Sequence, residues 1–179
     1  MNPAAGSDAI SKARGVRLMI FDVDGVLTDG RLYFTDRGEE IKSFNIQDGH
    51  GIKMLQASGV KLAILTARQS TIVERRAREL GIAHVRQGQA DKLTGFQDLL
   101  TECGLEAREA GYMGDDLVDL PVLTRSGLAV SVPDAPELVR SRADYVTTAR
   151  GGRGAVRELC ELILRAQGNF DAAVAPYLR

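Results

Sequence analysis

Two carboxylates stand directly after an apolar run near the beginning of the sequence. Residues 18–21 are apolar, and Asp22 and Asp24 follow them, with Gly25 next in the chain. Because strand side chains alternate between faces, both carboxylates start on the same face, and burying them costs free energy unless a metal or another partner compensates. Gly25 lets backbone N–H groups approach an anion closely. A loop-capping role explains one such carboxylate but not two, so the segment favours an active site.

A second acidic cluster stands at the end of another expected strand, in residues 113–119 (MGDDLVD), and it contains Asp119 as well as the adjacent Asp115 and Asp116. Asp115 or Asp116 alone could cap the helix expected after it. Together with Asp22 and Asp24 they form a set of hard oxygen ligands suited to octahedral Mg²⁺. The two histidines of the chain lack HxxxH spacing, which argues against a zinc site. The acidic clusters therefore predict a magnesium site.

Thr66 and Lys92 lie between the two acidic clusters, each at or after the end of an expected strand. Thr66 supplies a hydroxyl, and Lys92 supplies a positive charge for phosphate oxygens. A lone threonine or lysine is more often structural or solvated, so neither is specific by itself. The ordered set Asp-x-Asp, Thr, Lys and Gly-Asp-Asp is specific, and it predicts phosphate chemistry.

From residue 16 the chain alternates short apolar runs with amphipathic segments, a pattern typical of a doubly wound α/β fold with a mainly parallel sheet. The expected strands are residues 17–23, 61–66, 83–87, 110–115, 127–132 and 143–147. The expected helices are residues 52–58, 70–80, 92–100, 116–123, 135–141 and 154–167. In such sheets ligands bind beyond the carboxyl ends of the strands, and both acidic clusters follow strands.

Residues 31–44 interrupt this alternation, and they are predicted to form a β-hairpin with its turn at residues 36–38. Leu32, Phe34, Ile41 and Phe44 make this insertion too apolar to face water alone. A lid or a contact between subunits is therefore favoured over an ordinary surface meander. Residues 16–167 are expected to form one domain that includes the hairpin, preceded by a mobile segment, 1–15, and followed by a tail, 168–179.

Charge and composition exclude several classes of partner. The 23 basic and 24 acidic side chains leave a formal charge of −1, and the chain contains no tryptophan, so binding to nucleic acid is disfavoured. No apolar run approaches the roughly 18 residues of a membrane span, and the first residues lack the apolar stretch of a secretory signal. Cys103 and Cys160 form no disulfide framework. A cytoplasmic location is therefore expected.

Four segments in chain order, FDVDGVLTDG, LTAR, DK and GDD, resemble the motifs of the haloacid dehalogenase superfamily of phosphohydrolases. Further segments are similar to those of one family within it, the 3-deoxy-D-manno-octulosonate 8-phosphate (KDO 8-phosphate) phosphatases. These segments are the hairpin insertion, SFNIQDGHGIKML, VRQGQADKL, GDDLVDLPVL and RGGRGAVREL. The resemblance covers nearly the whole chain from residue 17. It implies a Mg²⁺-dependent phosphatase that releases KDO and inorganic phosphate on the way to lipopolysaccharide.

The resemblance implies roles for the acidic residues. Asp22 matches the nucleophile that forms a phosphoaspartate, and Asp24 matches the general acid that protonates the leaving oxygen and then activates water. Mg²⁺ would be held by Asp22, the backbone carbonyl of Asp24, and Asp115. Asp116 would support the metal through water or through Lys92.

The resemblance also implies which residues contact the substrate. Thr66 and Lys92 match the phosphate clamp, and Lys92 would also orient the nucleophile. Arg68 and Arg76 are about two helical turns apart on roughly one side, so both could face an anionic sugar, although the arginines around them are also typical of a solvated face. Lys53 stands where relatives carry Arg, and it lacks bidentate geometry. The expected substrate contacts are Asp24, Gly25, Asn45, Ile46, Gln47, Asp48, Gly49, Lys53, Thr66, Ala67, Arg68, Arg76 and Lys92.

Members of this superfamily usually cover the site with a cap domain, but here only the hairpin is inserted. The resemblance therefore implies a capless enzyme that assembles as a homotetramer, in which a neighbouring subunit completes the site for a small sugar-acid phosphate. The apolar hairpin and the C-terminal tail are the parts of the neighbour expected to cover the site.

Three alternatives stay open. A phosphatase for a nine-carbon, sialic-acid-like sugar acid 9-phosphate would share the scaffold. A receiver-type signalling module also combines acidic residues, Thr, Lys and Mg²⁺, but its acidic pair sits earlier and it has no Gly-Asp-Asp after the Lys. A catalytically silent tetramerisation domain is disfavoured by the intact set of Asp22, Asp24, Thr66, Lys92 and Asp115.

Overall fold

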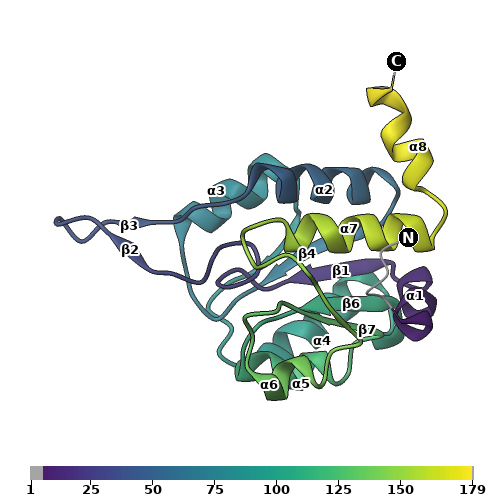
Figure 1. Cartoon of the computed structure of the whole chain (residues 1–179). Helices are drawn as coiled ribbons and strands as arrows, with labels where there is room; N and C mark the ends of the chain where they lie inside the picture. The colour runs from purple at the N-terminus through teal and green to yellow at the C-terminus, as the bar shows by residue number, and fades with distance from the viewer. Residues whose placement is uncertain (1–5, 179) are drawn as a thin grey trace.

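The computed structural model describes residues 6–178, and a six-stranded parallel sheet lies at its centre (Figure 1). The strands are β1 (Leu18–Phe21), β4 (Lys61–Leu65), β5 (His84–Arg86), β6 (Ala110–Met113), β7 (Leu128–Ser131) and β8 (Tyr145–Val146). Their order is β5-β4-β1-β6-β7-β8, and every neighbouring pair is parallel. This arrangement confirms the predicted doubly wound fold, whose strand order reverses beside β1.

Helices cover both faces of the sheet (Figure 1). On one face lie α2 (Ile46–Ala57), α3 (Thr71–Leu80) and α7 (Ala155–Ala166), and on the other lie α4 (Lys92–Cys103), α5 (Leu120–Leu123) and α6 (Glu137–Arg140). All residues of β1, β6 and β7 are buried, because helices cover these strands from both sides. This double burial explains why the strands are continuous apolar runs in the sequence.

The register of the three central strands aligns their carboxyl ends. Phe21, the last residue of β1, pairs with Ile64 of β4 on one side. On the other side Phe21 pairs with Met113, the last residue of β6. The segments that follow β1, β4 and β6 therefore leave the sheet at one edge, close to the reversal of the strand order, where doubly wound folds bind ligands.

Two helices differ most from their predicted bounds. The helix expected from residue 52 begins at Ile46, because the Asn45 side chain accepts hydrogen bonds from the N–H groups of Gln47 and Asp48 and caps the helix there. The helix expected over residues 116–123 is divided into a 3-10 turn, η2 (Leu117–Asp119), and α5. Pro121 stands at the start of α5, where a proline is tolerated.

The prediction of a mobile N-terminal segment over residues 1–15 is wrong for most of its length. A helix, α1 (Ser7–Arg14), packs against α7, and its Ala9 and Ala13 are fully buried. Lys12 also pairs with Asp144 at 2.5 Å between Nζ and Oδ1. Small side chains allow close packing of the two helices, a signal that composition alone does not reveal. Residues 1–5 of the predicted segment lie outside the described residues.

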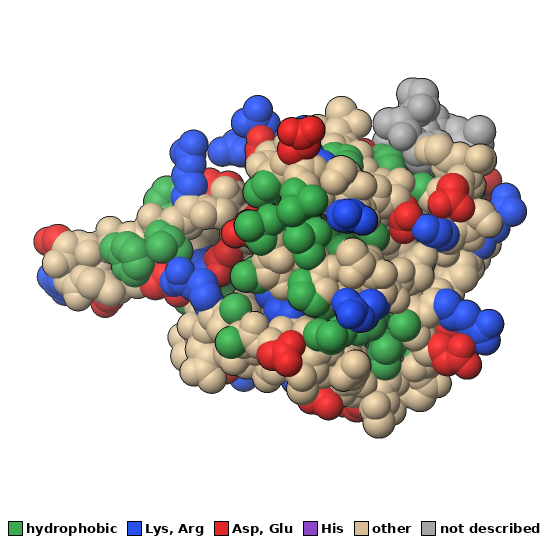
Figure 2. Space-filling view, turned by 90° about the horizontal axis from the view of Figure 1, so that it is seen from below, with side chains coloured by type: hydrophobic (Ala, Val, Ile, Leu, Met, Phe, Trp, Pro, Cys, Tyr) green, Lys and Arg blue, Asp and Glu red, His purple; other side chains and the backbone are tan. Residues whose placement is uncertain are grey.

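The predicted hairpin is confirmed as a two-stranded antiparallel ribbon of β2 (Tyr33–Phe34) and β3 (Glu40–Ile41). Gly38, with φ of 79°, supplies the left-handed residue of the turn. The hairpin stands away from the body of the molecule, with hydrophobic side chains on its flank (Figure 2). Leu32, Phe34 and Ile41 are each more than half exposed, whereas Phe44 packs against the core. Between residues 6 and 178, nothing of the size of a cap domain is inserted beside the sheet.

The C-terminal tail follows α7 and lies at the end of the molecule opposite to the hairpin (Figure 1). It forms a short helix, α8 (Phe170–Val174), and a 3-10 turn, η3 (Ala175–Tyr177). The Tyr177 hydroxyl lies 2.9 Å from Nε2 of His50 on α2. The described part of the tail therefore contacts α2 of the same chain. Across residues 6–178, no helix has both the length and the apolar character needed to cross a membrane.

Candidate active site

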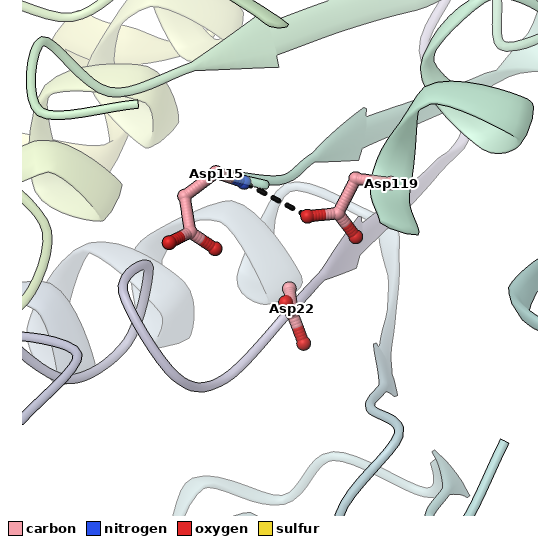
Figure 3. A group of neighbouring side chains, drawn as sticks. All are labelled: Asp22, Asp115 and Asp119. Atoms are coloured by element: carbon pink, nitrogen blue, oxygen red, sulfur yellow. Dashed lines mark hydrogen bonds between the residues drawn. The ribbon is translucent and has the colours of Figure 1, made fainter. Parts of the chain in front are cut away.

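Three carboxylates converge where the strand order reverses. Asp22 follows β1, and Asp115 and Asp119 belong to the segment after β6 (Figure 3). One carboxylate oxygen from each lies within 4.8 Å of the others. Thr66, the residue after β4, is buried at the same edge of the sheet. The structure thus brings together Asp22, Thr66 and Asp115, which the sequence analysis placed at the ends of strands.

Lys92 supplies the positive charge of this cluster. It is the first residue of α4, and the Asp91 side chain caps that helix by accepting the N–H groups of Leu93 and Thr94. The Lys92 side chain is 1% exposed, and its Nζ lies 2.7 Å from Oδ2 of Asp22 and 2.5 Å from Oδ1 of Asp119. The predicted contact between Lys92 and the nucleophile is therefore present in the structure.

Asp119 belongs to the acidic cluster found in the sequence, but no role in the site was predicted for it. One of its oxygens accepts the N–H groups of Asp115 (2.9 Å) and Asp116 (3.0 Å), and the other faces Lys92 and the Tyr112 hydroxyl. Both oxygens are therefore occupied by protein donors, so Asp119 holds the loop and the lysine in place. The sequence did hold a signal for it: Asp119 is four residues after Asp115, and one helical turn places residues at this spacing on the same side of a helix.

The support through Lys92 that was predicted for Asp116 is not seen, and support through water stays a prediction. Its exposed side chain accepts a hydrogen bond from the N–H of Leu117 and caps η2. Lys92, the group expected to link Asp116 to the metal, contacts Asp119 instead. The physical reason is the 3-10 turn: it directs Asp119 inward and leaves Asp116 at its exposed beginning.

Burial and like charge perturb the acid groups of the site. Burial raises the pKa of Asp22 to about 6, although the ammonium of Lys92 opposes the shift. Burial, assisted by the charges of Asp22 and Asp119, raises the pKa of Asp115 to about 8. Burial alone would lower the pKa of Lys92, but the neighbouring carboxylates outweigh it, so that pKa is raised. The excess of buried negative charge is the environment that a divalent cation relieves.

Asp115 and Gly25 complete the fit for a cation. Among residues 6–178, the side-chain oxygens of Asp115 form no hydrogen bond or ion pair. Gly25 has a φ of +90°, and a Cβ at its position would lie 1.9 Å from Oδ2 of Asp115. Only glycine therefore lets the loop after β1 approach this carboxylate. The donors at hand, Asp22 and Asp115, are the hard oxygen ligands that Mg²⁺ prefers.

The raised pKa of Asp115 predicts how the metal-free protein responds to pH. A carboxyl group whose folded pKa is about 8, against 3.8 for its ordinary value, favours folding when protonated, so stability falls as pH rises between those values. In chelator, Asp115→Asn should melt close to wild type near pH 5 and several degrees above it near pH 8, given about 2–4 °C per kcal/mol. Melting curves across this range measure the difference. Asp116→Asn is the matched control, and parallel profiles for wild type and Asp115→Asn would contradict the assignment.

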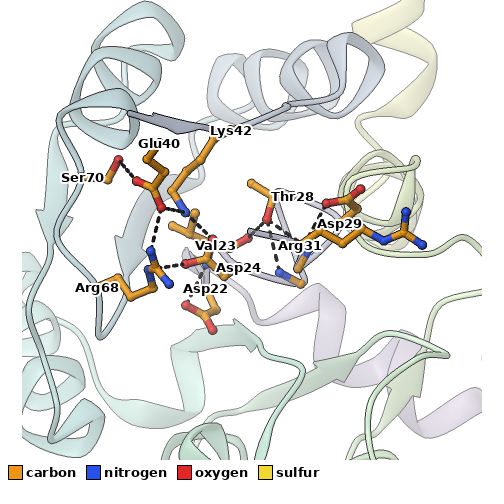
Figure 4. Close-up of polar contacts among 12 residues, drawn as sticks. Asp22, Val23, Asp24, Thr28, Asp29, Arg31, Glu40, Lys42, Arg68 and Ser70 are labelled. Atoms are coloured by element: carbon orange, nitrogen blue, oxygen red, sulfur yellow. Dashed lines mark hydrogen bonds and ion pairs between the residues drawn. The ribbon is translucent and has the colours of Figure 1, made fainter. Parts of the chain in front are cut away.

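Asp24, the predicted general acid, lies in a different environment from Asp22. Its Oδ1 is 2.5 Å from Nζ of Lys42, and its Oδ2 is 3.7 Å from Nε of Arg68 (Figure 4). Arg68 and Lys42 both contact Glu40, at 2.7 and 3.4 Å. The sequence pattern of residues 31–44 indicates only an apolar insertion, so the polar contacts of Glu40 and Lys42 were not predicted.

Two residues at the start of α2, Asn45 and Asp48, use their side chains to hold the fold. Asn45 caps α2, Ile46 is 85% exposed, and Gln47 is also exposed. Asp48 is buried, and its carboxylate accepts the N–H groups of Gly154 (3.3 Å) and Arg157 (2.8 Å) at the beginning of α7. The Asp48 side chain therefore links α2 to the beginning of α7, and the sugar contacts expected of residues 45–49 stay predictions.

The expected arrangement of the basic residues is corrected by the structure. Arg68 precedes α3, so it is not on one helix with Arg76. Arg76 packs over Phe44 and against Gly49, where a Cβ would lie 2.4 Å from its guanidinium. Lys53 is exposed and lines a separate cavity of about 510 Å³ between α2 and the tail. Only Arg68 of these three contacts the predicted catalytic residues. The exposed Ala67 precedes it.

Comparisons with known proteins agree with this geometry. A model of the haloacid dehalogenase-like hydrolase family matches residues 82–159. The 3-deoxy-D-manno-octulosonate 8-phosphate phosphatase of Escherichia coli K12 is 50% identical over 167 residues, which are 93% of this chain and 89% of that protein.

Two solved structures are also similar. A probable phosphatase from Pseudomonas syringae superposes with a TM-score of 0.95 at 53% identity, over 97% of this chain and 99% of the other. The 3-deoxy-D-manno-octulosonate 8-phosphate phosphatase of Moraxella catarrhalis, in complex with magnesium, phosphate and KDO, superposes with a TM-score of 0.93 at 48% identity. The match covers 95% of this chain and 98% of the other. The chain therefore belongs to the KDO 8-phosphate phosphatase family of haloacid dehalogenase-like hydrolases, and it is a phosphoric monoester hydrolase.

Proposed function

We propose that the protein is a Mg²⁺-dependent phosphatase that hydrolyses KDO 8-phosphate to KDO and inorganic phosphate through a phosphoaspartate, in the formation of lipopolysaccharide precursors. The observation that carries the proposal is the Asp22 carboxylate held between Lys92, at 2.7 Å, and the Asp115 carboxylate at the edge of the sheet. The complex of the Moraxella catarrhalis relative with magnesium, phosphate and KDO supports the choice of metal and sugar.

The proposed reaction has two displacements at phosphorus. An Asp22 oxygen attacks the phosphorus, the bond to the sugar oxygen breaks, and Asp24 gives its proton to that oxygen. Asp24 then takes a proton from water, whose oxygen attacks the phosphoaspartate and releases inorganic phosphate. Asp22 and Asp24 return to their initial states, so protons and charge balance over the cycle.

The remaining residues of the cluster serve the phosphoryl group. Asp22, Asp115 and the backbone carbonyl of Asp24 would hold Mg²⁺, which when bound neutralises negative charge on the nucleophile and the phosphoryl oxygens. Lys92 keeps Asp22 ionised and oriented, and it offers charge to a phosphoryl oxygen beside it. Thr66 offers its hydroxyl from the end of β4. Without these positive groups, two anions would have to approach each other.

The substrate can be tested by comparing sugar phosphates. We expect kcat/KM for KDO 8-phosphate to exceed that for a nine-carbon sugar acid 9-phosphate by at least tenfold, and chelation to remove activity until Mg²⁺ is added back. The measurement is phosphate release from both compounds, with and without chelator. A preference for the nine-carbon compound would favour the alternative substrate, and full activity in chelator would contradict the metal site.

The position of Arg68 leads us to expect that it helps the enzyme to discriminate between large anionic substrates and small ones. Its side chain is 43% exposed and lies beside Asp24, where the carboxylate of a sugar acid can reach it. Arg68→Ala should lower kcat/KM for KDO 8-phosphate by about 10- to 100-fold but affect 2,4-dinitrophenyl phosphate, a small ester whose leaving group needs no proton, by less than about threefold, because only the large anion uses this charge. Arg75→Ala, on the exposed side of α3, is the matched control. Arg76→Ala tests the other predicted contact, and equal losses on both substrates would assign either arginine to folding.

We further propose a homotetramer in which a neighbour completes the site. The exposed Leu32, Phe34 and Ile41 on the hairpin support a contact between copies. Light scattering should give about four times the mass of one chain, and Phe34→Asp should lower it. A monomer with full activity at assay concentration would contradict the shared site.

Whether the tail enters a neighbour's site stays a prediction, as does the cytoplasmic location inferred from the two unpaired cysteines.

A further inference from the structure

The hairpin carries a buried lysine that faces the active site. Lys42 follows β3 directly, and its side chain is 3% exposed although the hairpin projects into solvent. Glu40 and Lys42 are two positions apart, so they point to the same side of the extended chain. Ile41, between them, points away and is 52% exposed. The returning strand of the hairpin therefore has a polar face toward the site and an apolar face away from it.

Two carboxylates compensate the buried ammonium. Nζ of Lys42 lies 2.5 Å from Oδ1 of Asp24 and 3.4 Å from Oε1 of Glu40 (Figure 4). Burying an ammonium is costly unless charged partners with good geometry surround it. Lys42 therefore binds the hairpin to the loop after β1 that contains Asp24.

Glu40 is itself held from a third segment. Its carboxylate lies 2.7 Å from a guanidinium nitrogen of Arg68, and it accepts a hydrogen bond from Oγ of Ser70 at 3.2 Å. Arg68 and Ser70 belong to the segment between β4 and α3. The position of the Lys42 ammonium is therefore fixed by groups on both sides, rather than by its own flexible side chain.

We propose that Lys42, held by Glu40, is a positioning residue for the general acid Asp24. Lys42 donates to Oδ1 of Asp24 and so fixes the orientation of this carboxylate, which leaves Oδ2, 3.7 Å from Nε of Arg68, as the oxygen that can face the leaving group. A general acid is effective only when its proton is aimed at the leaving oxygen, and a displacement of about 1 Å can cost about 10²-fold in rate. The inference rests on the proposed function, in which Asp24 protonates the leaving group.

The test uses leaving groups that differ in their need for a proton. Phenyl phosphate and KDO 8-phosphate release oxyanions that need protonation, whereas 2,4-dinitrophenyl phosphate releases a stable phenolate. Lys42→Met keeps much of the side-chain length and removes the charge. It should lower kcat/KM for the first two substrates on the order of 10²-fold and change kcat/KM for the dinitrophenyl ester by less than about threefold. Because kcat/KM covers the steps up to the phosphoaspartate, the later hydrolysis does not obscure the comparison.

Further variants separate positioning from folding. Lys42→Arg should recover part of the loss, and Glu40→Gln should show a smaller loss with the same dependence on the leaving group. Arg37→Met, at the exposed turn of the same hairpin, is the matched control and should match wild type. Melting temperature and light scattering for each variant show whether fold and assembly are kept.

The outcomes distinguish the inference from the proposed function. Equal losses on all three esters, or no loss on any, would overturn the role of Lys42. Asp24→Asn should show the same leaving-group dependence more strongly. If Asp24→Asn shows none, Asp24 is not the general acid, and the proposed function fails together with the inference. If Asp24→Asn shows the dependence and Lys42→Met does not, only the inference fails.

Discussion

Asp22→Asn is expected to abolish phosphate release, with a fall in kcat on the order of 10⁴-fold or more. The neutral amide is a poor nucleophile toward phosphorus, and the variant also loses a carboxylate that faces Lys92 and the cation site. Phosphate release from KDO 8-phosphate at saturating Mg²⁺ measures the effect. No covalent phosphoenzyme should form on the variant.

The fold should survive this substitution. Asp22→Asn removes a buried negative charge next to two others, and Lys92 keeps its partner Asp119, so the melting temperature should not fall by more than a few degrees. Asp98→Asn, on the exposed side of α4, is the control and should match wild type. Turnover of Asp22→Asn near the wild-type rate, with deamidation excluded by mass spectrometry, would refute the role of Asp22.

Asp119→Ala is expected to damage both stability and activity. It leaves the buried ammonium of Lys92 with one carboxylate and removes the acceptor of two backbone N–H groups. Removing one partner of a buried ion pair costs about 3–5 kcal/mol. For a chain of this size that corresponds to a melting temperature lower by very roughly 6–20 °C, which differential scanning calorimetry measures.

Asp119→Asn separates the two effects, because its amide oxygen still accepts the backbone N–H groups while the charge is lost. We expect a smaller loss of stability than in Asp119→Ala and a clear fall in kcat, since Lys92 is then less well held. Asp116→Asn is the control, because this side chain is exposed and caps η2. A larger effect of Asp116→Asn than of Asp119→Asn would restore the role that the sequence suggested for Asp116.

The strands and the catalytic edge were predictable because they depend on local pattern and on a general rule. Short, largely apolar segments that alternate with amphipathic ones identified all six strands of the sheet, and parallel strands present their carboxyl ends at one edge. The sequence alone could therefore place Asp22, Thr66 and Asp115 together. The hairpin was predictable for a similar reason, since a turn centred on Gly38 separates two short extended segments.

Other features depend on local geometry that the sequence does not specify. Asp116 and Asp119 are both plausible from spacing, and only the 3-10 turn determines that Asp119 is buried. α1 was missed because Ala9 and Ala13 are small, and their burial depends on α7, far away in the chain. Lys42 was missed because a charged residue on an exposed hairpin is normally solvated.

Trapping of the covalent intermediate tests most directly whether Asp22 is the nucleophile. Enzyme with Mg²⁺ is mixed with KDO 8-phosphate, quenched within the first turnovers and reduced with borohydride, which converts a phosphoaspartate into homoserine. We expect homoserine at position 22, identified by mass spectrometry of the peptide that contains it, and none when substrate or metal is omitted. Turnover of KDO 8-phosphate with no modification at Asp22, or with the modification at another carboxylate, would contradict this role of Asp22.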